Sequence, residues 1–378
     1  MEEVTTRTLP IENLTAQRAY AALRAKASTR SSFLIETSTP GARRSTIGFL
    51  VKSEAAHPAP SNVPHDLHAT AAQLPPRAEN PDLVAACFRD VLALIAFDVA
   101  LPVLGAQPFP DLPFIAREMR DLTSIVFDHD AGTFTIVATN PNVVERVART
   151  FAAAPELPAL AAPGAGPPVY FLAAPPETVF LKQHTRAEKA LSIGGIDRLM
   201  LARVFKSQPA GAELFDVYRA LREASPEGHA FFIDLPATPT FTAFALAATG
   251  ATATTLTATS PVEVFTAELL AALPTADLAG SPAKDALDVL RDMESQSRRM
   301  RGGAFVRARP GGQIDLLSTD TAVFFEEEQF QTVGLAPIVP GRDTASHTAA
   351  CQDDALPALQ AIRRAQDTAQ ARESESHN

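Results

Sequence analysis

The chain has 378 residues, of which 46% are hydrophobic, and a formal net charge of -10 at pH 7. This length and apolar content suffice for one large core or two smaller ones, so the sequence predicts a globular protein. The acidic balance argues against a nucleic-acid-binding surface, because phosphate contacts need an excess of Lys and Arg.

The start of the chain and its apolar runs predict a cytoplasmic protein without a membrane segment. Residues 1–4 are acidic and no apolar stretch follows them, which argues against a signal peptide. The longest apolar run, residues 91–97, is too short to cross a bilayer.

In the first 160 residues, the hydrophobic spacing predicts a helix followed by strands. Residues 14–27 have helical spacing, and residues 33–36 and 46–51 read as two strands around a Pro-Gly turn. Residues 53–80 lack periodicity and are rich in Pro, Ala, Ser and His, as expected for a long loop. The remaining expected elements are a hairpin with strands at 123–128 and 133–138, a helix at 141–153 and a linker at 155–168.

The rest of the chain contains both predicted helices and predicted strands and ends in a polar tail. The predicted helices are at 185–191, 212–223, 281–293 and 356–366, and the predicted strands at 198–204, 230–234, 252–259, 303–308 and 315–325. The composition of residues 367–378 predicts a disordered end.

Several segments resemble the motifs of one enzyme family and occur in that family's order. The segments are FLIET at 33–37, RRSTIG at 43–48, LMLAR at 199–203, FDVYRALREASPEGHAFFID at 215–234, SP at 260–261, 273–293, RGGA at 301–304 and GLAPIV at 334–339. Together they resemble the chorismate-utilising enzymes, which include anthranilate, aminodeoxychorismate, isochorismate and salicylate synthases. The resemblance implies an α+β fold of antiparallel sheets packed face to face, with helices outside. Residues 1–160 would correspond to the amino-terminal region of anthranilate synthase component I, and residues 161–366 to a shortened chorismate-binding core.

The core is expected to be shortened because two matching segments nearly meet. Phe265 is followed within a few residues by the segment that starts at Leu273, whereas family members carry a central block with much of the active site between them. The loss of that block would open a sheet edge or expose an apolar face. A second copy or a partner chain could cover such a surface.

The resemblance also implies a magnesium site and anion-binding groups that this chain lacks. Family enzymes bind chorismate through Mg²⁺ on acidic ligands, an arginine and N–H groups of a glycine-rich strand. Here Ala349 and Ala350 stand where carboxylates are expected, and Asp354 stands at a lysine position. Asp320 falls on or near the substrate-binding arginine, and Pro337 lacks the N–H of a glycine. We therefore expect no metal cofactor.

The acid and base positions of the family are altered as well. Arg198 stands at the position of the lysine base, and a guanidinium stays protonated at neutral pH. Val262 stands at the position of the acid, and strand alternation would turn the neighbouring Glu263 to the opposite face. Ala276 and Asp277 replace a Gly-Thr pair.

These losses favour a catalytically impaired relative that acts as a binding, scaffold or regulatory subunit in chorismate-derived aromatic biosynthesis. The expected partners are a second copy, an intact homologue, a glutamine amidotransferase or a small aromatic ligand. The resemblance gives as ligand-binding candidates Glu36, Thr37, Arg43, Ser45, Arg203, His229, Gly280 and Lys284.

Two alternatives stay open. In the first, the chain is an active enzyme in which Arg198, Arg203, Glu263 and Lys284 run a metal-free reaction, or a partner chain supplies the absent block. In the second, the chain is an aromatic amino-acid sensor built on the amino-terminal region around Glu36.

Other polar clusters have simpler interpretations. The histidines of one loop, His57, His65 and His68, could bind zinc, but no regular element orients them. The basic run at 298–301, with Arg307 and Arg309 after it, could hold a small anion, but a solvated helix end and loop is the favoured interpretation. The distant cysteines Cys87 and Cys351 are expected to be buried thiols, and no disulfide is predicted.

Overall fold

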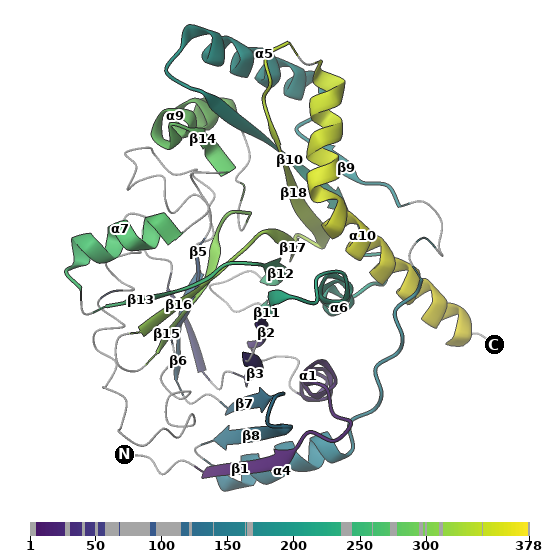
Figure 1. Cartoon of the computed structure of the whole chain (residues 1–378). Helices are drawn as coiled ribbons and strands as arrows, with labels where there is room; N and C mark the ends of the chain where they lie inside the picture. Colours follow the sequence, from purple (N-terminus) through teal and green to yellow (C-terminus); the bar gives the residue numbers. More distant parts are fainter. Residues whose placement is uncertain are drawn as a thin grey trace.

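In the computed structural model, the described part of the chain forms two antiparallel sheets with helices around them (Figure 1). The described residues are 5–26, 31–39, 42–49, 52–56, 68, 91–95, 115–120, 123–138, 140–162, 164, 169–235, 244–258, 260–272, 278–294, 298, 301–309, 313–341 and 343–376. Among them, no helix combines the length and apolar character that a membrane span requires.

The larger sheet has twelve strands and runs through both halves of the sequence. Its order is β1-β8-β7-β3-β2-β11-β12-β17-β18-β10-β14, and β9 also pairs with β10. The bounds are β1 Thr5–Pro10, β2 Ser32–Thr39, β3 Ala42–Phe49, β7 Thr123–Asp128, β8 Thr133–Ala138, β9 Leu172–Ala174, β10 Arg198–Ser207, β11 Gly228–Leu235, β12 Phe244–Gly250, β14 Gly280–Ser281, β17 Thr321–Glu326 and β18 Gln329–Pro337. Since β2 pairs with β11, the two predicted parts share one sheet. The division near residue 160 stays a prediction.

The smaller sheet has six strands and packs face to face against the larger one. Its order is β13-β16-β15-β5-β6-β4. The bounds are β4 Lys52–Ala56, β5 Val91–Ile95, β6 Ile115–Arg120, β13 Ala253–Thr257, β15 Ala304–Arg309 and β16 Gln313–Ser318. Phe305 of β15 contacts Phe231 of β11, with 5.3 Å between the ring centroids. This inter-sheet core confirms the predicted fold class.

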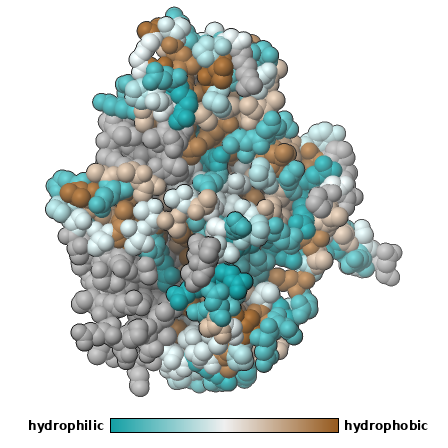
Figure 2. All heavy atoms as spheres, in the orientation of Figure 1, coloured by the Kyte–Doolittle hydropathy of each residue, from teal (hydrophilic) through white to brown (hydrophobic). Residues whose placement is uncertain are grey.

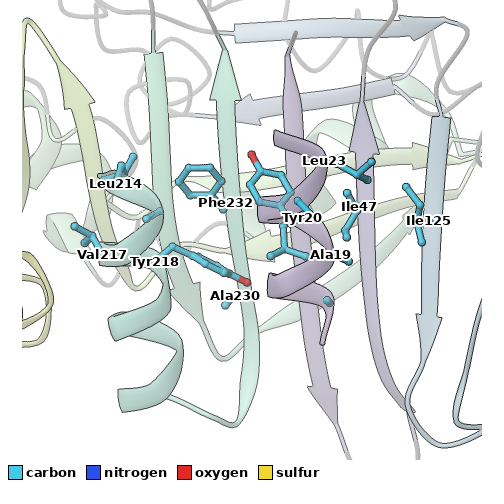
Figure 3. Close-up of a cluster of buried hydrophobic side chains, with 14 of the residues drawn as sticks. Ala19, Tyr20, Leu23, Ile47, Ile125, Leu214, Val217, Tyr218, Ala230 and Phe232 are labelled. Atoms are coloured by element: carbon cyan, nitrogen blue, oxygen red, sulfur yellow. The ribbon is translucent and has the colours of Figure 1, made fainter. Parts of the chain in front are cut away.

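Helices cover the outer face of the larger sheet. The bounds of all described helices are α1 Ala16–Arg24, α4 Pro141–Ala152, α5 Glu177–Ile193, α6 Leu214–Ala224, α7 Val262–Ala272, α9 Ala283–Met293 and α10 Thr344–Ser376. Figure 3 shows Tyr20 of α1 and Tyr218 of α6 lying over Phe232, Ile47 and their neighbours on the strands. The alternation of apolar residues along these strands buries one set here and the other set between the sheets.

Helices α5, α9 and α10 pack over β10 and β18 at the other end of the molecule (Figure 1). The contact between α10 and β18 is close, because a Cβ atom at Gly334 would lie 1.9 Å from the Cys351 carbonyl oxygen. Cys351 is buried, as predicted, and burial raises the pKa of its thiol to about 12. Cys87 lies outside the described residues.

The prediction of a disordered tail at 367–378 is wrong for its described part. Helix α10 continues through Ser376, and Asp367, Thr368 and Ala369 are buried. Arg372 also pairs with Asp216 of α6, with 2.8 Å between Nη1 and Oδ2. A polar composition predicts disorder, but it cannot show that these residues contact other elements of the fold.

The predicted single strand at 315–325 is two strands in different sheets. Residues of β16 pair with β13 and β15, whereas those of β17 pair with β12 and β18. Between them, the Thr319 N–H donates to the Gly303 carbonyl and the Asp320 N–H to the Thr249 carbonyl. These two hydrogen bonds mark the point where the chain passes from one sheet to the other.

Exposed large apolar side chains gather on and beside α5. Figure 2 shows hydrophobic atoms at the end of the molecule where this helix lies. The exposed large apolar residues of α5 are Val179, Leu181 and Ile193, whereas Tyr170 and Leu172 lie just before and in β9. By contrast, Val306, Ile314 and Leu316 of the smaller sheet are buried.

Candidate functional site

Strand β10 carries the position that the resemblance assigns to the base. Leu199 and Leu201 face the core under α5, α9 and α10, whereas Met200 and Val204 face the inter-sheet core. Because side chains alternate along a strand, Arg198 and Arg203 lie on opposite faces of the sheet. Arg198 is exposed. The two guanidinium groups therefore do not meet at one site.

Arg203 is buried in a network at the start of α5. Its Nη1 donates to Glu177 Oε2 at 3.1 Å and its Nη2 to the Pro175 carbonyl at 3.1 Å. The guanidinium carbon also lies 4.7 Å from the centroid of the Phe180 ring. These contacts hold α5 against β10, and the Glu177 carboxylate balances the charge of Arg203.

A buried ion pair fills the gap between β14 and β9 along the edge of β10. Glu294 Oε1 accepts from the Ala202 N–H at 3.0 Å, and Arg298 Nη2 donates to the Met200 carbonyl at 2.5 Å. Arg298 Nε donates to Glu294 Oε2 at 2.9 Å, and Arg298 Nη1 donates to the Leu278 carbonyl. Arg298 is 0% exposed, so its predicted place at a solvated helix end is wrong. The i,i+4 spacing of Glu294 and Arg298 was the available sequence signal.

Gly280 and Lys284 lie where β14 leads into α9. Gly280 has φ +144, and a Cβ atom there would lie 2.1 Å from the Arg198 carbonyl oxygen. Glycine is therefore needed for the close approach of β14 to β10. Lys284 is exposed on the first turn of α9, away from the buried Arg203.

The acid position lies on a helix rather than a strand. Val262 and Glu263 form the start of α7, and Glu263 is exposed. The prediction that strand alternation turns Glu263 to the opposite face is therefore based on a wrong reason, because the residue lies on a helix. Residues 273–277 lie outside the described part, so the predicted loss of the central block stays a prediction.

Asp354 of α10, at the lysine position, is bound to two donors. Arg301 Nη2 lies 2.9 Å from both Oδ1 and Oδ2, and the Leu335 N–H donates to Oδ2 at 2.9 Å. Arg301 thus neutralises the reversed charge at this position. The neighbouring Ala349 and Ala350 offer no metal-ligating atoms in their side chains.

Asp320 and His229 bind backbone groups near the crossing between the sheets. Asp320 Oδ2 accepts from the Ala251 N–H at 2.8 Å. The buried His229 donates from Nε2 to the Ser318 carbonyl at 2.8 Å, and burial lowers the pKa of its imidazole. Both side chains thus stabilise turns.

Two of the amino-terminal candidates, Glu36 and Ser45, bind the side chains of buried or partly buried neighbours. Glu36 accepts from Tyr218 Oη at 2.5 Å and from Gln17 Nε2 at 3.0 Å, and burial together with Glu36 raises the pKa of Tyr218. Beside it in register, Ser45 Oγ lies 2.7 Å from His129 Nε2.

The other two amino-terminal candidates lie closer to the solvent. Arg43 is exposed and pairs with Asp130 at 3.0 Å, and Thr37 Oγ1 donates to the Arg44 carbonyl at 3.2 Å. The register thus brings Glu36 and Ser45 together on the helix-covered face, while Arg43 lies at the hairpin turn.

Two buried histidines join α5 to the start of α10. His184 Nε2 lies 2.7 Å from His347 Nδ1, and the Val339 N–H donates to His347 Nε2 at 3.1 Å. His184 Nδ1 lies 3.6 Å from Glu188 Oε2. Burial and the neighbouring His347 lower the pKa of His184.

The proposed zinc histidines cannot be compared as a set, because His57 and His65 lie outside the described residues. His68 Nε2 lies 2.8 Å from the Ser260 carbonyl oxygen. Within the described part of the chain, no group of three or more His, Cys, Asp or Glu side chains could hold a metal ion. The expectation that the chain has no metal cofactor stays a prediction.

The sequence of the chain matches the model of a known family. The model of the chorismate binding enzyme family matches residues 18–245, which is more than half of the chain. The chain therefore belongs to the chorismate binding enzyme family. No curated protein matches the sequence significantly.

Solved structures of this family share the fold. MenF, the menaquinone-specific isochorismate synthase from Escherichia coli, is 13% identical, with a TM-score of 0.66 over 95% of this chain and 94% of that one. The putative 2,3-dihydroxybenzoate-specific isochorismate synthase DhbC from Bacillus anthracis is 12% identical, with a TM-score of 0.58 over 91% of this chain and 99% of that one. Anthranilate synthase component I from Streptococcus pneumoniae TIGR4 is 14% identical, with a TM-score of 0.57 over 87% of this chain and 92% of that one.

Proposed function

We propose that this chain is a non-catalytic member of the family and acts as a binding, scaffold or regulatory subunit in chorismate-derived aromatic biosynthesis in the cytoplasm. The observation that carries the proposal is the separation of the charged candidates. Arg198 and Arg203 lie on opposite faces of β10, and the Arg203 guanidinium is enclosed by Glu177, Pro175 and Phe180. General acid–base chemistry needs such groups within hydrogen-bond reach of one substrate.

Charge at the family's anion-binding positions supports the same conclusion. Asp320 is acidic where the family has its substrate-binding arginine, and like charges repel a dicarboxylate substrate. Ala349 and Ala350 lack the oxygen ligands that Mg²⁺ requires. We propose that the chain functions without a metal cofactor.

The partner is proposed to be a second copy of the chain, an intact homologue or a glutamine amidotransferase, with a small aromatic molecule as a further ligand. One similar structure is component I of an anthranilate synthase, a name that implies a second component. Light scattering of the purified chain tests the homodimer, and co-purification with an intact homologue or an amidotransferase tests the heteromer.

The test of catalysis is an assay of the purified chain with chorismate, Mg²⁺ and an ammonia source. We expect chorismate to disappear no faster than in buffer, while MenF serves as the positive control in the same mixture. Turnover at an enzyme-like rate would refute the proposal. Circular dichroism of the sample verifies that the chain is folded.

A further inference from the structure

The start of α10 meets α5 at one end of the molecule through a pair of buried imidazoles (Figure 1). His184 of α5 is 3% exposed and His347 of α10 is 0% exposed, and their ring centroids lie 4.3 Å apart. His184 Nε2 lies 2.7 Å from His347 Nδ1. Because buried polar groups have little access to water, the protons of the two rings must match the protein groups around them.

The other contacts of the pair fix where these protons lie. The Val339 N–H donates to His347 Nε2 at 3.1 Å, so this nitrogen is an acceptor. A neutral His347 then carries its proton on Nδ1, which faces His184 Nε2 and lies 3.1 Å from the Asp343 carbonyl oxygen. A neutral His184 in turn carries its proton on Nδ1, which lies 3.6 Å from Glu188 Oε2. Two neutral rings therefore satisfy every contact of the pair.

A third proton cannot be added to the pair without the loss of one of these contacts. Only one proton fits between His184 Nε2 and His347 Nδ1 at a distance of 2.7 Å. A pair with three protons therefore has a hydrogen on each outer nitrogen, one of which is His347 Nε2. That hydrogen would face the Val339 N–H, and two donors cannot form a hydrogen bond with each other. Protonation must therefore separate the two rings or release Val339.

The pair holds the segment between β18 and α10 against α5. In this segment, the Val339 N–H is bound to His347, and the Gly341 N–H donates to Glu188 Oε1 at 3.2 Å. Glu188 also lies beside His184, so the two attachments depend on the same turn of α5. Val339 is 44% exposed, and Gly341 is exposed as well. A segment with so little apolar burial can open locally while the rest of the fold stays intact.

The charges around the pair place its protonation in mild acid. Burial and, next, His347 lower the pKa of His184, whereas Glu188 and Asp343 raise it by less. From β10, the charge of Arg203 is bound to the first residue of α5, and α9 meets α5 through an amide side chain. His184 therefore takes up a second proton only below about pH 6.5, the ordinary pKa of histidine.

We propose that His184 and His347 form a pH-sensitive switch, which holds the segment between β18 and α10 on α5 at neutral pH and releases it in mild acid. Release changes the surface that this end of the chain presents to a partner. The switch does not rest on the proposed function, because neither histidine is among the candidate site residues.

Hydrogen exchange tests the switch at about pH 7.5 and about pH 5.5, with the amides of residues 338–348 compared with those of the central strand β2. We expect the 338–348 amides to be less protected than β2 at both pH values, because local opening disrupts fewer contacts than unfolding. After correction for the intrinsic effect of pH on exchange, their protection should fall by about tenfold at the lower pH. One histidine with a pKa of about 6.5 in the open state gives this factor.

Two variants assign the effect to the pair. His184→Gln/His347→Gln lacks both imidazoles, so the protection of its 338–348 amides should be the same at both pH values. His129→Gln makes the same substitution at a partly buried histidine beside Ser45 and should keep the wild-type loss. Should the double variant not fold, His347→Gln replaces it, since it removes the nitrogen that faces the Val339 N–H, and the same constant protection is expected.

Equal protection of the 338–348 amides and of β2 would overturn the switch, since the segment would then open only with the whole fold. A loss of protection that is as large in the variant without both imidazoles as in the wild-type chain would overturn it as well. Neither result bears on the chorismate assay, so a failure of the switch and a failure of the proposed function are distinguishable.

Discussion

At the scale of single residues, the ion pair of Glu294 and Arg298 binds backbone groups on the edge of β10 where no described strand pairs. Its members bind the Ala202 N–H and the Met200 carbonyl, which have no strand partner on that side among the described residues. Their side chains are 5% and 0% exposed, respectively. Removal of one partner would leave the other as a buried, uncompensated charge.

We expect Arg298→Met to lower the free energy of unfolding by about 3–5 kcal/mol, because the Glu294 carboxylate would stay buried without its counter-ion. Urea denaturation measures the loss. Arg291→Ala, which removes a partly exposed ion pair on α9, should cost less than about 1 kcal/mol. Similar values for the two variants would contradict the role of the buried pair.

The contact between His184 and His347 predicts a pH dependence of stability. The Val339 N–H donates to His347 Nε2, and His184 Nε2 lies 2.7 Å from His347 Nδ1, a distance at which only one of these two nitrogens carries a proton. Burial and the neighbouring His347 lower the pKa of His184, so the folded state favours its neutral imidazole, although Glu188 and Asp343 oppose this. The stabilisation is complete above the unfolded pKa of about 6.5 and is lost as the pH falls below it.

We expect the wild-type chain to lose more stability between about pH 7.5 and 5.5 than His184→Gln loses. The difference has an upper limit of about 1.4 kcal/mol per pH unit for one proton. Thr185→Ala, on the exposed side of α5, should keep the wild-type dependence. Denaturation curves at each pH measure the difference, and identical slopes for wild type and His184→Gln would contradict the assignment.

At the scale of elements, the carboxyl-terminal turns of α10 belong to the folded core. Ala369 packs into the cluster under α6, and Arg372 binds both oxygens of the buried Asp216 at 2.8 and 3.2 Å. Asp216 also accepts from Arg219. Loss of these turns would uncover apolar surface and remove one counter-ion of Asp216.

We therefore expect a chain that stops after Gln366 to be less stable than the full chain by about 2–4 kcal/mol, from lost apolar burial and a weakened ion pair. A chain that stops after Glu373 keeps Arg372, and the described residues that it loses, 374–376, are exposed, so its stability should match the full chain. Thermal unfolding of the three proteins measures the difference. Equal stability of the shorter chain would indicate that the tail is dispensable.

The elements show which parts of the fold local patterns can reveal. Two strand-like runs at 123–128 and 133–138, separated by turn residues, predicted β7 and β8 correctly, because β-branched and aromatic residues around such a turn mark a hairpin. The length of α10 was missed because, outside residues 356–366, its buried residues are small or polar, although alanines contribute to its buried face. Their spacing at Ala358, Ala361, Ala365 and Ala369 was the available signal.

The arrangement of the site could be predicted only for residues whose position follows from the alternation of side chains along a strand. The opposite faces of Arg198 and Arg203 follow from their spacing on one strand. The burial of Arg298 does not, since its acceptors include a carbonyl on β10 that lies 98 residues earlier. Nor could the spacing show that Arg301 would meet Asp354, because they lie on separate elements.

At the scale of the whole molecule, the larger sheet joins the first 160 residues to the rest. β2 and β11 are paired from Ser32 opposite Asp234 to Ser38 opposite Gly228. One apolar cluster contains Ile136, Leu34 and Phe232 together. Neither part can open along this seam without exposing paired strands and apolar side chains. The two parts should therefore lose their structure in one step.

Ile136→Ala in β8 tests this coupling, because Ile136 is a buried residue of the first part of the chain. We expect it to lower the free energy of opening by about 2–5 kcal/mol in β7 and equally in β11, as the loss of packing is shared by the whole sheet. Hydrogen exchange at increasing denaturant concentration measures both strands. Arg7→Ala on β1, whose ion pair with Glu145 is exposed, should change neither. A loss confined to β7 would show that the parts unfold separately and that the division near residue 160 is a true domain boundary.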